Sequence, residues 1–194
     1  MAVEQVEEIQ QAPVRRWRFT VDDYYRMGEV GILPHDARVE LVDGDAIELP
    51  PVSSLGNGTV ASVRELLHER IQSRATIGVR GPPILPQYGA PQPDILVLRR
   101  REDFYRSANP TAEDVLFLIE VSDSTLAYDR DTKGPIYARA GIPEYWIVKL
   151  RDRTLLVHRE PVDGVYRSVA VLARGDTVQP LAFPDVTVLV ADLL

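Results

Sequence analysis

The residues best suited to chemistry lie in one stretch of the chain, from Val115 to Tyr137. Within it, Glu120 follows the apolar run Leu-Phe-Leu-Ile and precedes Val121, a pattern typical of a strand covered on both faces. Burying a lone ionised carboxylate is costly, so such a strand needs a compensating cation, a hydrogen-bond network or a metal ion. The pattern therefore predicts a functional or compensated charge at Glu120.

A second carboxylate, Asp94, opens another predicted strand. If the two strands pair, Asp94, Glu120 and the backbone carbonyl of Val121 meet at one edge, and alternation puts Ser122 on the side of Glu120. Oxygen ligands of this kind suit Mg²⁺ or Mn²⁺. The following helix is placed to project Lys133 over this edge, where its charge can orient a water molecule or stabilise developing negative charge. Considered alone, Asp94 is better explained as a residue at the start of a strand whose side chain accepts hydrogen bonds from nearby backbone amides.

The hydrophobic patterns predict the elements that position these groups. Apolar residues at helical spacing, N-cap residues and glycine stops define the helices, and short β-branched runs bounded by Gly and Pro define the strands. Pro135 predicts a kink because it removes a backbone hydrogen bond. The predicted helices cover residues 20–27, 57–72 (or 59–72) and 126–139; the predicted strands cover 38–41, 46–49, 76–80, 84–88, 95–98, 116–121, 144–148, 154–159 and 165–172, with a short strand and a helical turn in 186–194.

Composition sets the class of protein. A chain of 194 residues with 45% hydrophobic and 26% charged residues predicts a single globular domain over residues 17–194, after a flexible tail at residues 1–16. The absence of cysteine excludes disulfides, thiolate zinc sites and cysteine nucleophiles. No apolar run is long enough for a membrane span and no secretory signal is evident, which predicts a cytoplasmic location.

The formal net charge of -7 argues against tight nonspecific binding to nucleic acid. A local basic patch can still act within an acidic protein, and a metal ion neutralises the acids that bind it. Residues 99–106 hold the only local cluster of arginines with aromatic residues, which we interpret as a solvated loop rather than a phosphate contact. His68 lies beside the apolar stripe of its helix and is interpreted as a packed or solvated residue.

Several motifs together resemble one family. The sequence is similar to the Uma family of restriction-endonuclease-like nucleases, within the PD-(D/E)XK superfamily, over most of the chain from Phe19 onward. The matching segments are RVELVDG at Arg38 to Gly44, PD at Pro93-Asp94, EVSDS at Glu120 to Ser124, DRDTK at Asp129 to Lys133 and YARAGIPEYWIV at Tyr137 to Val148.

The resemblance implies a fold and an activity. The fold is α/β, with a central mixed sheet flanked by helices, β-hairpins toward both ends, and a core of helix, three-stranded meander, helix and further strand. The implied activity is Mg²⁺- or Mn²⁺-dependent hydrolysis of phosphodiester bonds in nucleic acid, with DNA as the expected substrate. A homodimer is implied as well, because cutting two strands calls for two sites.

The resemblance also implies roles for particular residues. Asp94 and Glu120 would bind the metal with the Val121 carbonyl, and Glu40 would be an accessory metal or water ligand. Ser122 stands where the wider superfamily has its lysine, a function that Lys133 would take over. A second departure is Asn57, where relatives often carry a histidine.

Two other interpretations remain open at this point. The chain can be a catalytically silent binding or assembly module that keeps the nuclease fold, in line with its acidic charge, Ser122 and Asn57. In the other interpretation, Glu120 has a purely structural role and pairs with a buried arginine.

Overall fold

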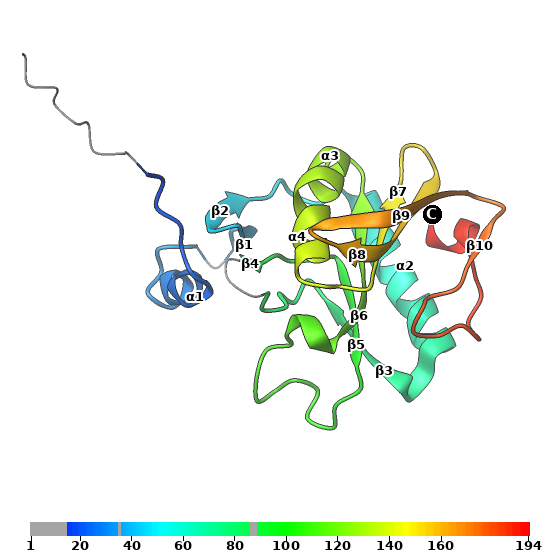
Figure 1. Ribbon diagram of the computed structural model, residues 1–194, viewed down its shortest axis with the longest axis horizontal. Helices are drawn as coiled ribbons and strands as arrows, with labels where there is room; N and C mark the ends of the chain where they lie inside the picture. The colour runs from blue at the N-terminus through cyan, green and yellow to red at the C-terminus, as the bar shows by residue number, and fades with distance from the viewer. Residues whose placement is uncertain (1–14, 35, 86–88) are drawn as a thin grey trace, which may run out of the picture.

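A six-stranded sheet forms the centre of the protein (Figure 1). The computed structural model describes residues 15–34, 36–85 and 89–194. The strands follow the spatial order β3-β5-β6-β7-β8-β9. Their bounds are β3 Ala75–Val79, β5 Ile95–Arg99, β6 Val115–Ser122, β7 Glu144–Lys149, β8 Thr154–Val162 and β9 Val165–Ala173.

The sheet is mixed, as predicted. β3, β5 and β6 form an antiparallel meander, while β6 and β7 pair in parallel. A parallel pair needs a crossover connection, which here is the helical segment between β6 and β7. β7, β8 and β9 are again antiparallel, and β8 and β9 form a long hairpin. The core of helix, meander, helix and further strand is therefore confirmed.

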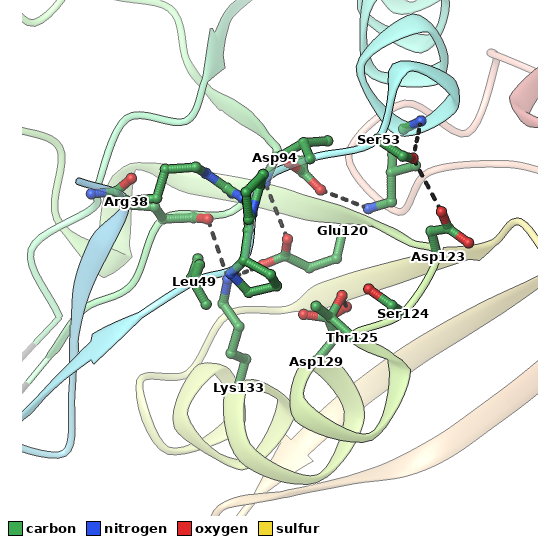
Figure 2. A pocket seen from close by; sticks show the side chains of 16 residues that line it. Arg38, Leu49, Ser53, Asp94, Glu120, Asp123, Ser124, Thr125, Asp129 and Lys133 are labelled. Carbon is green, nitrogen blue, oxygen red and sulfur yellow. Dashed lines mark hydrogen bonds and ion pairs between the residues drawn. The ribbon is translucent and has the colours of Figure 1, made fainter. Parts of the chain in front are cut away.

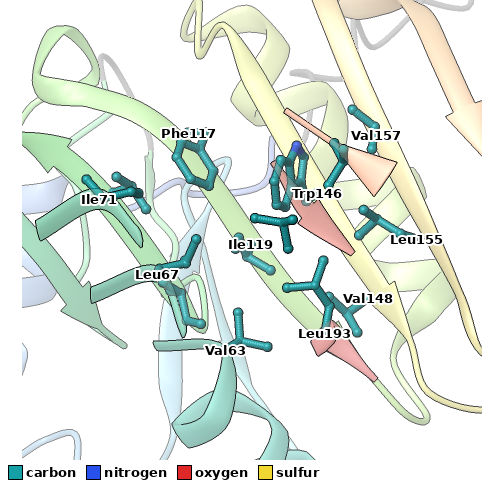
Figure 3. Packing of buried hydrophobic residues seen from close by; sticks show 14 of the residues in the cluster. Val63, Leu67, Ile71, Phe117, Ile119, Trp146, Val148, Leu155, Val157 and Leu193 are labelled. Atoms are coloured by element: carbon teal, nitrogen blue, oxygen red, sulfur yellow. The ribbon is translucent and has the colours of Figure 1, made fainter. Parts of the chain in front are cut away.

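Strand alternation divides the core between the two faces of the sheet. On one face, Phe117 and Ile119 of β6 pack with α2 (Ser54–Ile71) and with the C-terminal segment (Figure 3). On the other face, Leu118 packs with the crossover helix α4 (Gly134–Arg139). Because side chains alternate, Glu120 belongs to the face of Leu118 and points toward the crossover helices.

A small sheet lies beside the main one, in the order β2-β1-β4. β1 (Val39–Val42) and β2 (Asp45–Glu48) form the predicted hairpin. Its turn residues Asp43 and Gly44 have φ of 49° and 80°, the conformation that an Asp-Gly hairpin turn requires. β4 (Gly89–Ala90) pairs with β1, and this contact brings the segment before Asp94 next to β1.

The crossover helix contains a local widening. A short helix α3 (Leu126–Tyr128) continues into a π-helical turn η3 (Asp129–Lys133) and then into α4. The amide of Gly134 donates to the carbonyl of Asp129, five residues earlier. Pro135 has no amide proton to continue the ordinary ladder, so the predicted disturbance near it takes the form of a π-turn.

Two sequence predictions differ from the structure. The second helix begins at Ser54, not at Asn57 or Thr59, because Ser53 caps it by accepting a hydrogen bond from the Gly56 amide. The strand predicted over residues 84–88 differs at its start, where Ile84 and Leu85 make isolated bridges; residues 86–88 lie outside the described part of the chain. Of the tail predicted over residues 1–16, residues 1–14 also lie outside it.

The remaining elements are short. The N-terminal helix α1 (Val21–Glu29) is capped by Thr20. Single 3₁₀ turns η1 (Gln72–Arg74), η2 (Ala112–Asp114) and η4 (Val190–Leu193), with the pair β10 (Thr177–Val178) and β11 (Val188–Leu189), complete the described fold. Among the described residues, no helix is both long and apolar enough to cross a membrane.

One buried acid in the sheet is compensated by neighbours of its own. Glu144, at the start of β7, is 0% exposed. Its Oε1 accepts hydrogen bonds from Arg159 Nη2 at 2.6 Å and from the Trp146 indole at 2.9 Å. Its Oε2 accepts from the Leu181 amide at 2.7 Å, which ties the C-terminal segment to the sheet.

Removing this acid will destabilise the fold. We expect Glu144→Ala to lower the free energy of unfolding by about 3–5 kcal/mol, because Arg159 and the Leu181 amide lose their acceptor. Urea unfolding measures the change, and Glu65→Ala, on the exposed face of α2, is the control with an expected change within about 0.5 kcal/mol. Equal stability of the two variants would contradict the structural role of Glu144.

Candidate active site

A small pocket of about 90 Å³ opens at the carboxyl end of β6, beside the N-terminus of α2 (Figure 2). Residues from four segments of the chain line it, and most of them are polar or proline. They are Arg38, Leu49, Pro50, Pro51, Val52, Ser53, Gly56, Gln92, Asp94, Glu120, Val121, Asp123, Ser124, Thr125, Asp129 and Lys133.

Glu120 lies at the floor of this pocket and is 4% exposed. Its Oε1 lies 2.6 Å from Lys133 Nζ and accepts a hydrogen bond from the Tyr137 hydroxyl at 3.1 Å. Its Oε2 accepts from the Asp94 amide at 3.3 Å. The cation that compensates Glu120 is thus Lys133, and the interpretation that Glu120 pairs with a buried arginine is wrong.

Asp94 and Glu120 are locked together by reciprocal backbone contacts. While the Asp94 amide donates to Glu120, Asp94 Oδ2 accepts from the Val121 amide at 2.9 Å. The amide and carbonyl of one strand residue point to the same side, so the Val121 carbonyl is directed toward the same edge as Asp94. The structure therefore brings the three groups of the predicted ligand set to one end of the β5–β6 pair.

Lys133 reaches this edge from the π-turn and is 1% exposed. Besides Glu120, its Nζ lies 3.2 Å from Glu40 Oε2 and donates to the Gln92 carbonyl at 3.2 Å. An ammonium group has three donors, and three acceptors surround this one. Figure 2 shows the side chain rising from its helix into the carboxylate cluster.

Glu40 lies behind Lys133, fully buried on β1. Its Oε2 also accepts from the Gln92 amide at 2.7 Å, and its Oε1 accepts from the Tyr128 hydroxyl at 2.6 Å. Both oxygens are thus engaged by protein groups. In this arrangement Glu40 holds Lys133, and its predicted role as an accessory metal ligand would require these contacts to rearrange.

Ser122 and Asp129 lie beside the carboxylate cluster. The Ser122 hydroxyl is buried and makes no hydrogen bond to the described residues. Asp129, 4% exposed, accepts from the Thr125 hydroxyl at 2.7 Å. Asp129 belongs to the DRDTK motif. Its spacing from Lys133 predicts only that the two residues share one face of a helix, and nothing in the sequence indicates that Asp129 lines the pocket.

Arg80 is a further neighbour that sequence reasoning missed. Its Nε lies 3.5 Å from Asp94 Oδ1, and its Nη2 donates to Asn57 Oδ1 at 2.7 Å. Arg80 lies between an edge strand and the sequence Gly-Pro-Pro. Nothing in this local pattern indicates that Arg80 contacts a candidate site residue. Only the pairing of β3 with β5 brings Arg80 next to Asp94.

The arginine-rich loop at residues 99–106 is not part of the pocket. Arg99 and Asp94 lie at opposite ends of β5, about 17 Å apart at the usual rise of a strand. Within the loop, Arg100 stacks over Phe104 and Arg101 over Tyr105. His68 is exposed on α2 and does not line the pocket either.

Acids outnumber bases at this end of the sheet. Four carboxylates (Glu40, Asp94, Glu120 and Asp129) are buried there, whereas Lys133 is the one cation buried among the described residues. Arg80 and Arg38, the neighbouring cations, are partly exposed. Burial raises the pKa of Glu120 well above its ordinary value despite the attraction of Lys133, and burial also raises the pKa of Asp129. Burial alone would lower the pKa of Lys133, but Glu120, Glu40 and Asp129 outweigh it and raise this pKa.

This imbalance fits a divalent cation. Mg²⁺ and Mn²⁺ commonly take one or two protein carboxylates and complete their shells with water. Asp94, Glu120 and the Val121 carbonyl provide such a set, and the pocket volume is several times what one water needs. Within the described ranges no three acidic or histidine side chains are already arranged to hold an ion, so carbonyl and water oxygens would have to complete the shell.

The raised pKa of Glu120 makes its contribution to stability depend on pH. Folded protein binds this proton more tightly than unfolded protein, so the metal-free wild type loses stability as pH rises through the folded pKa. Glu120→Gln has no such proton. We therefore expect its free energy of unfolding, relative to wild type, to increase between about pH 5 and about pH 8.

Urea unfolding in EDTA at several pH values measures this difference. The control is Glu65→Gln on the exposed face of α2, whose difference from wild type should stay constant. A Glu120→Gln curve that runs parallel to wild type would show that Glu120 is ionised throughout this range.

Comparison with known proteins gives a consistent result. No curated protein matches the sequence. Among solved structures, a protein described as a putative nuclease belonging to DUF820, from Anabaena variabilis, superposes with a TM-score of 0.69 at 17% identity. The match covers 90% of this chain and 97% of that one, and at this identity it establishes the fold alone.

The family follows from the sequence itself. Residues 21–191 match the model of the Uma2 family, described as "putative restriction endonuclease". This range includes the whole pocket, from Arg38 to Lys133. The chain therefore belongs to the Uma2 family, and its fold is that of a restriction-endonuclease-like nuclease.

Proposed function

We propose that this protein is a divalent-metal-dependent endonuclease that hydrolyses phosphodiester bonds of DNA. The observation that carries the proposal is the convergence of Asp94, Glu120 and Lys133 in one pocket at the end of β6. Membership of a nuclease family supports the reaction class. The metal, the DNA substrate and a homodimeric assembly are our inferences.

In this proposal Asp94, Glu120 and the Val121 carbonyl hold Mg²⁺ or Mn²⁺. The bound cation would supply Lewis acidity toward the phosphate and toward an attacking water. Asp94 and Glu120 are suited to this task because their reciprocal backbone contacts fix both carboxylates before any ligand arrives. Preorganised groups need no rearrangement during the reaction.

Lys133 is the proposed electrostatic group. Its raised pKa keeps it protonated, so it would stabilise negative charge on the phosphate or orient the attacking water rather than act as a base. Glu40 and the Gln92 carbonyl hold Lys133, and the Tyr128 hydroxyl in turn donates to Glu40. Ser122, whose buried hydroxyl makes no hydrogen bond to the described residues, lines a neighbouring pocket and not the one that holds Lys133.

The alternative is a catalytically silent module that keeps the fold. Its support is that all three donors of Lys133 already have protein acceptors, and that Asn57 is held by Arg80. The two candidate functions differ in metal binding and in cleavage, and each can be measured separately.

Calorimetry with Mn²⁺ tests the ligand set directly. We expect wild type to bind Mn²⁺ and Asp94→Asn to lose this binding, because the neutral amide is a weaker ligand than a carboxylate. Asp22→Asn, on the exposed first turn of α1, removes the same charge elsewhere and should bind like wild type. Absence of Mn²⁺ binding by wild type would remove the metal-dependent mechanism.

Plasmid cleavage in Mg²⁺ or Mn²⁺ tests the reaction. We expect Glu120→Gln and Lys133→Met to lower the cleavage rate at least about 10²-fold, the usual cost of losing one electrostatic contact to the transition state. Circular dichroism and unfolding curves show whether each variant is folded, since Lys133→Met also leaves buried acids unpaired. Cleavage that persists in folded Glu120→Gln would refute the assignment of this site.

A further inference from the structure

A second groove lies next to the pocket, between α2 and the edge strand β3. It has a volume of about 400 Å³ and opens to solvent. Its lining combines two arginines, one amide and small apolar side chains, and it contains no acid. The lining residues are Asn57, Val60, Ala61, Arg64, Ile77, Val79 and Arg80.

The two arginines of this groove differ in their contacts. Arg64 is exposed on α2 and makes no ion pair with any of the described residues. Arg80 is one-third exposed and joins the groove to the pocket, because it contacts Asn57 in the groove and Asp94 in the pocket. A positive track without acids is unusual on a protein with a net charge of -7.

The spacing of these groups matches a nucleic-acid strand. Asn57 and Arg64 are seven residues apart on one face of α2, which is about 10 Å along the helix axis. One strand of a DNA duplex carries a phosphate about every 3.4 Å along its axis, so this distance spans about three phosphates. Val79 is 39% exposed at the groove and offers an apolar surface between the charges.

We propose that the groove between α2 and β3 binds the sugar-phosphate backbone of the DNA strand that enters the pocket, with Arg64 and Arg80 contacting its phosphates. This inference rests on the proposed function, cleavage of DNA, and adds the location of the bound DNA strand on the protein surface. The charge of the groove and its continuity with Asp94 through Arg80 carry it. The arginine-rich loop at the far end of β5 is too distant to guide the same phosphates to the pocket.

Fluorescence anisotropy with a labelled DNA duplex in EDTA tests the groove without cleavage. We expect Arg64→Ala to weaken binding about eightfold at about 0.1 M salt, and to reduce the slope of log K against log salt by about 0.9, as the loss of one phosphate contact requires. Arg64→Glu should weaken binding further. Arg64 is exposed, so neither substitution puts folding at risk.

The matched control is Arg70→Ala, which removes an exposed arginine from the same helix outside the groove. Equal effects of Arg64→Ala and Arg70→Ala, or wild type that binds no DNA, would overturn the proposal. Failure of the groove and failure of the nuclease function are distinguishable. If only the groove proposal fails, Arg64→Ala keeps wild-type cleavage and Mn²⁺ binding. If only the nuclease function fails, DNA binding still depends on Arg64, but the wild-type protein does not cleave DNA.

Discussion

The excess of buried carboxylates at the carboxyl end of β6 is the constraint on which the site depends. Lys133 alone cannot neutralise Glu120, Glu40 and Asp129, and Arg80 is shared with Asn57. Burial is the main reason why the pKa of Glu120 rises although a cation lies 2.6 Å away, and the charges of Asp129 and Asp94 raise it further. A proton or a divalent cation can supply the missing charge, so metal-free protein is expected to hold the site together partly by protonation.

Glu144 shows that burial of an acid does not by itself indicate function. It is as fully buried as Glu40, yet its oxygens accept from a guanidinium, an indole and a backbone amide. One base balances one acid there, and the pair ties the C-terminal segment to the sheet. What distinguishes Glu120 from Glu144 is therefore the excess of buried acids around it, combined with a pocket large enough for water; these two features support the proposed site.

Distant segments of the chain are needed to assemble the pocket. The hairpin at β1 contributes Glu40, the start of β5 contributes Asp94, and the π-turn of the crossover contributes Lys133. The π-turn is a consequence of Pro135, and it lies where both Asp129 and Lys133 turn inward. A local irregularity of the backbone thus coincides with the two charges nearest Glu120, as such turns often do at functional sites.

Local sequence patterns were sufficient for the strand that carries Glu120 and for the candidates Asp94 and Lys133, because hydrophobic periodicity and turn residues are local signals. The prediction of a mixed sheet with its meander came from the family resemblance. Local patterns could not reveal Arg80, the engagement of both Glu40 oxygens or the Glu144 cluster. These depend on strand register and on side chains that meet across the sheet, which local patterns do not encode. The isolated bridges of Ile84 and Leu85, at the start of a predicted strand, depend in the same way on partners elsewhere in the chain. The sequence by itself identified which carboxylates are candidate metal ligands; only the tertiary structure decided which protein groups contact each of them, because hydrogen-bond partners are fixed by packing.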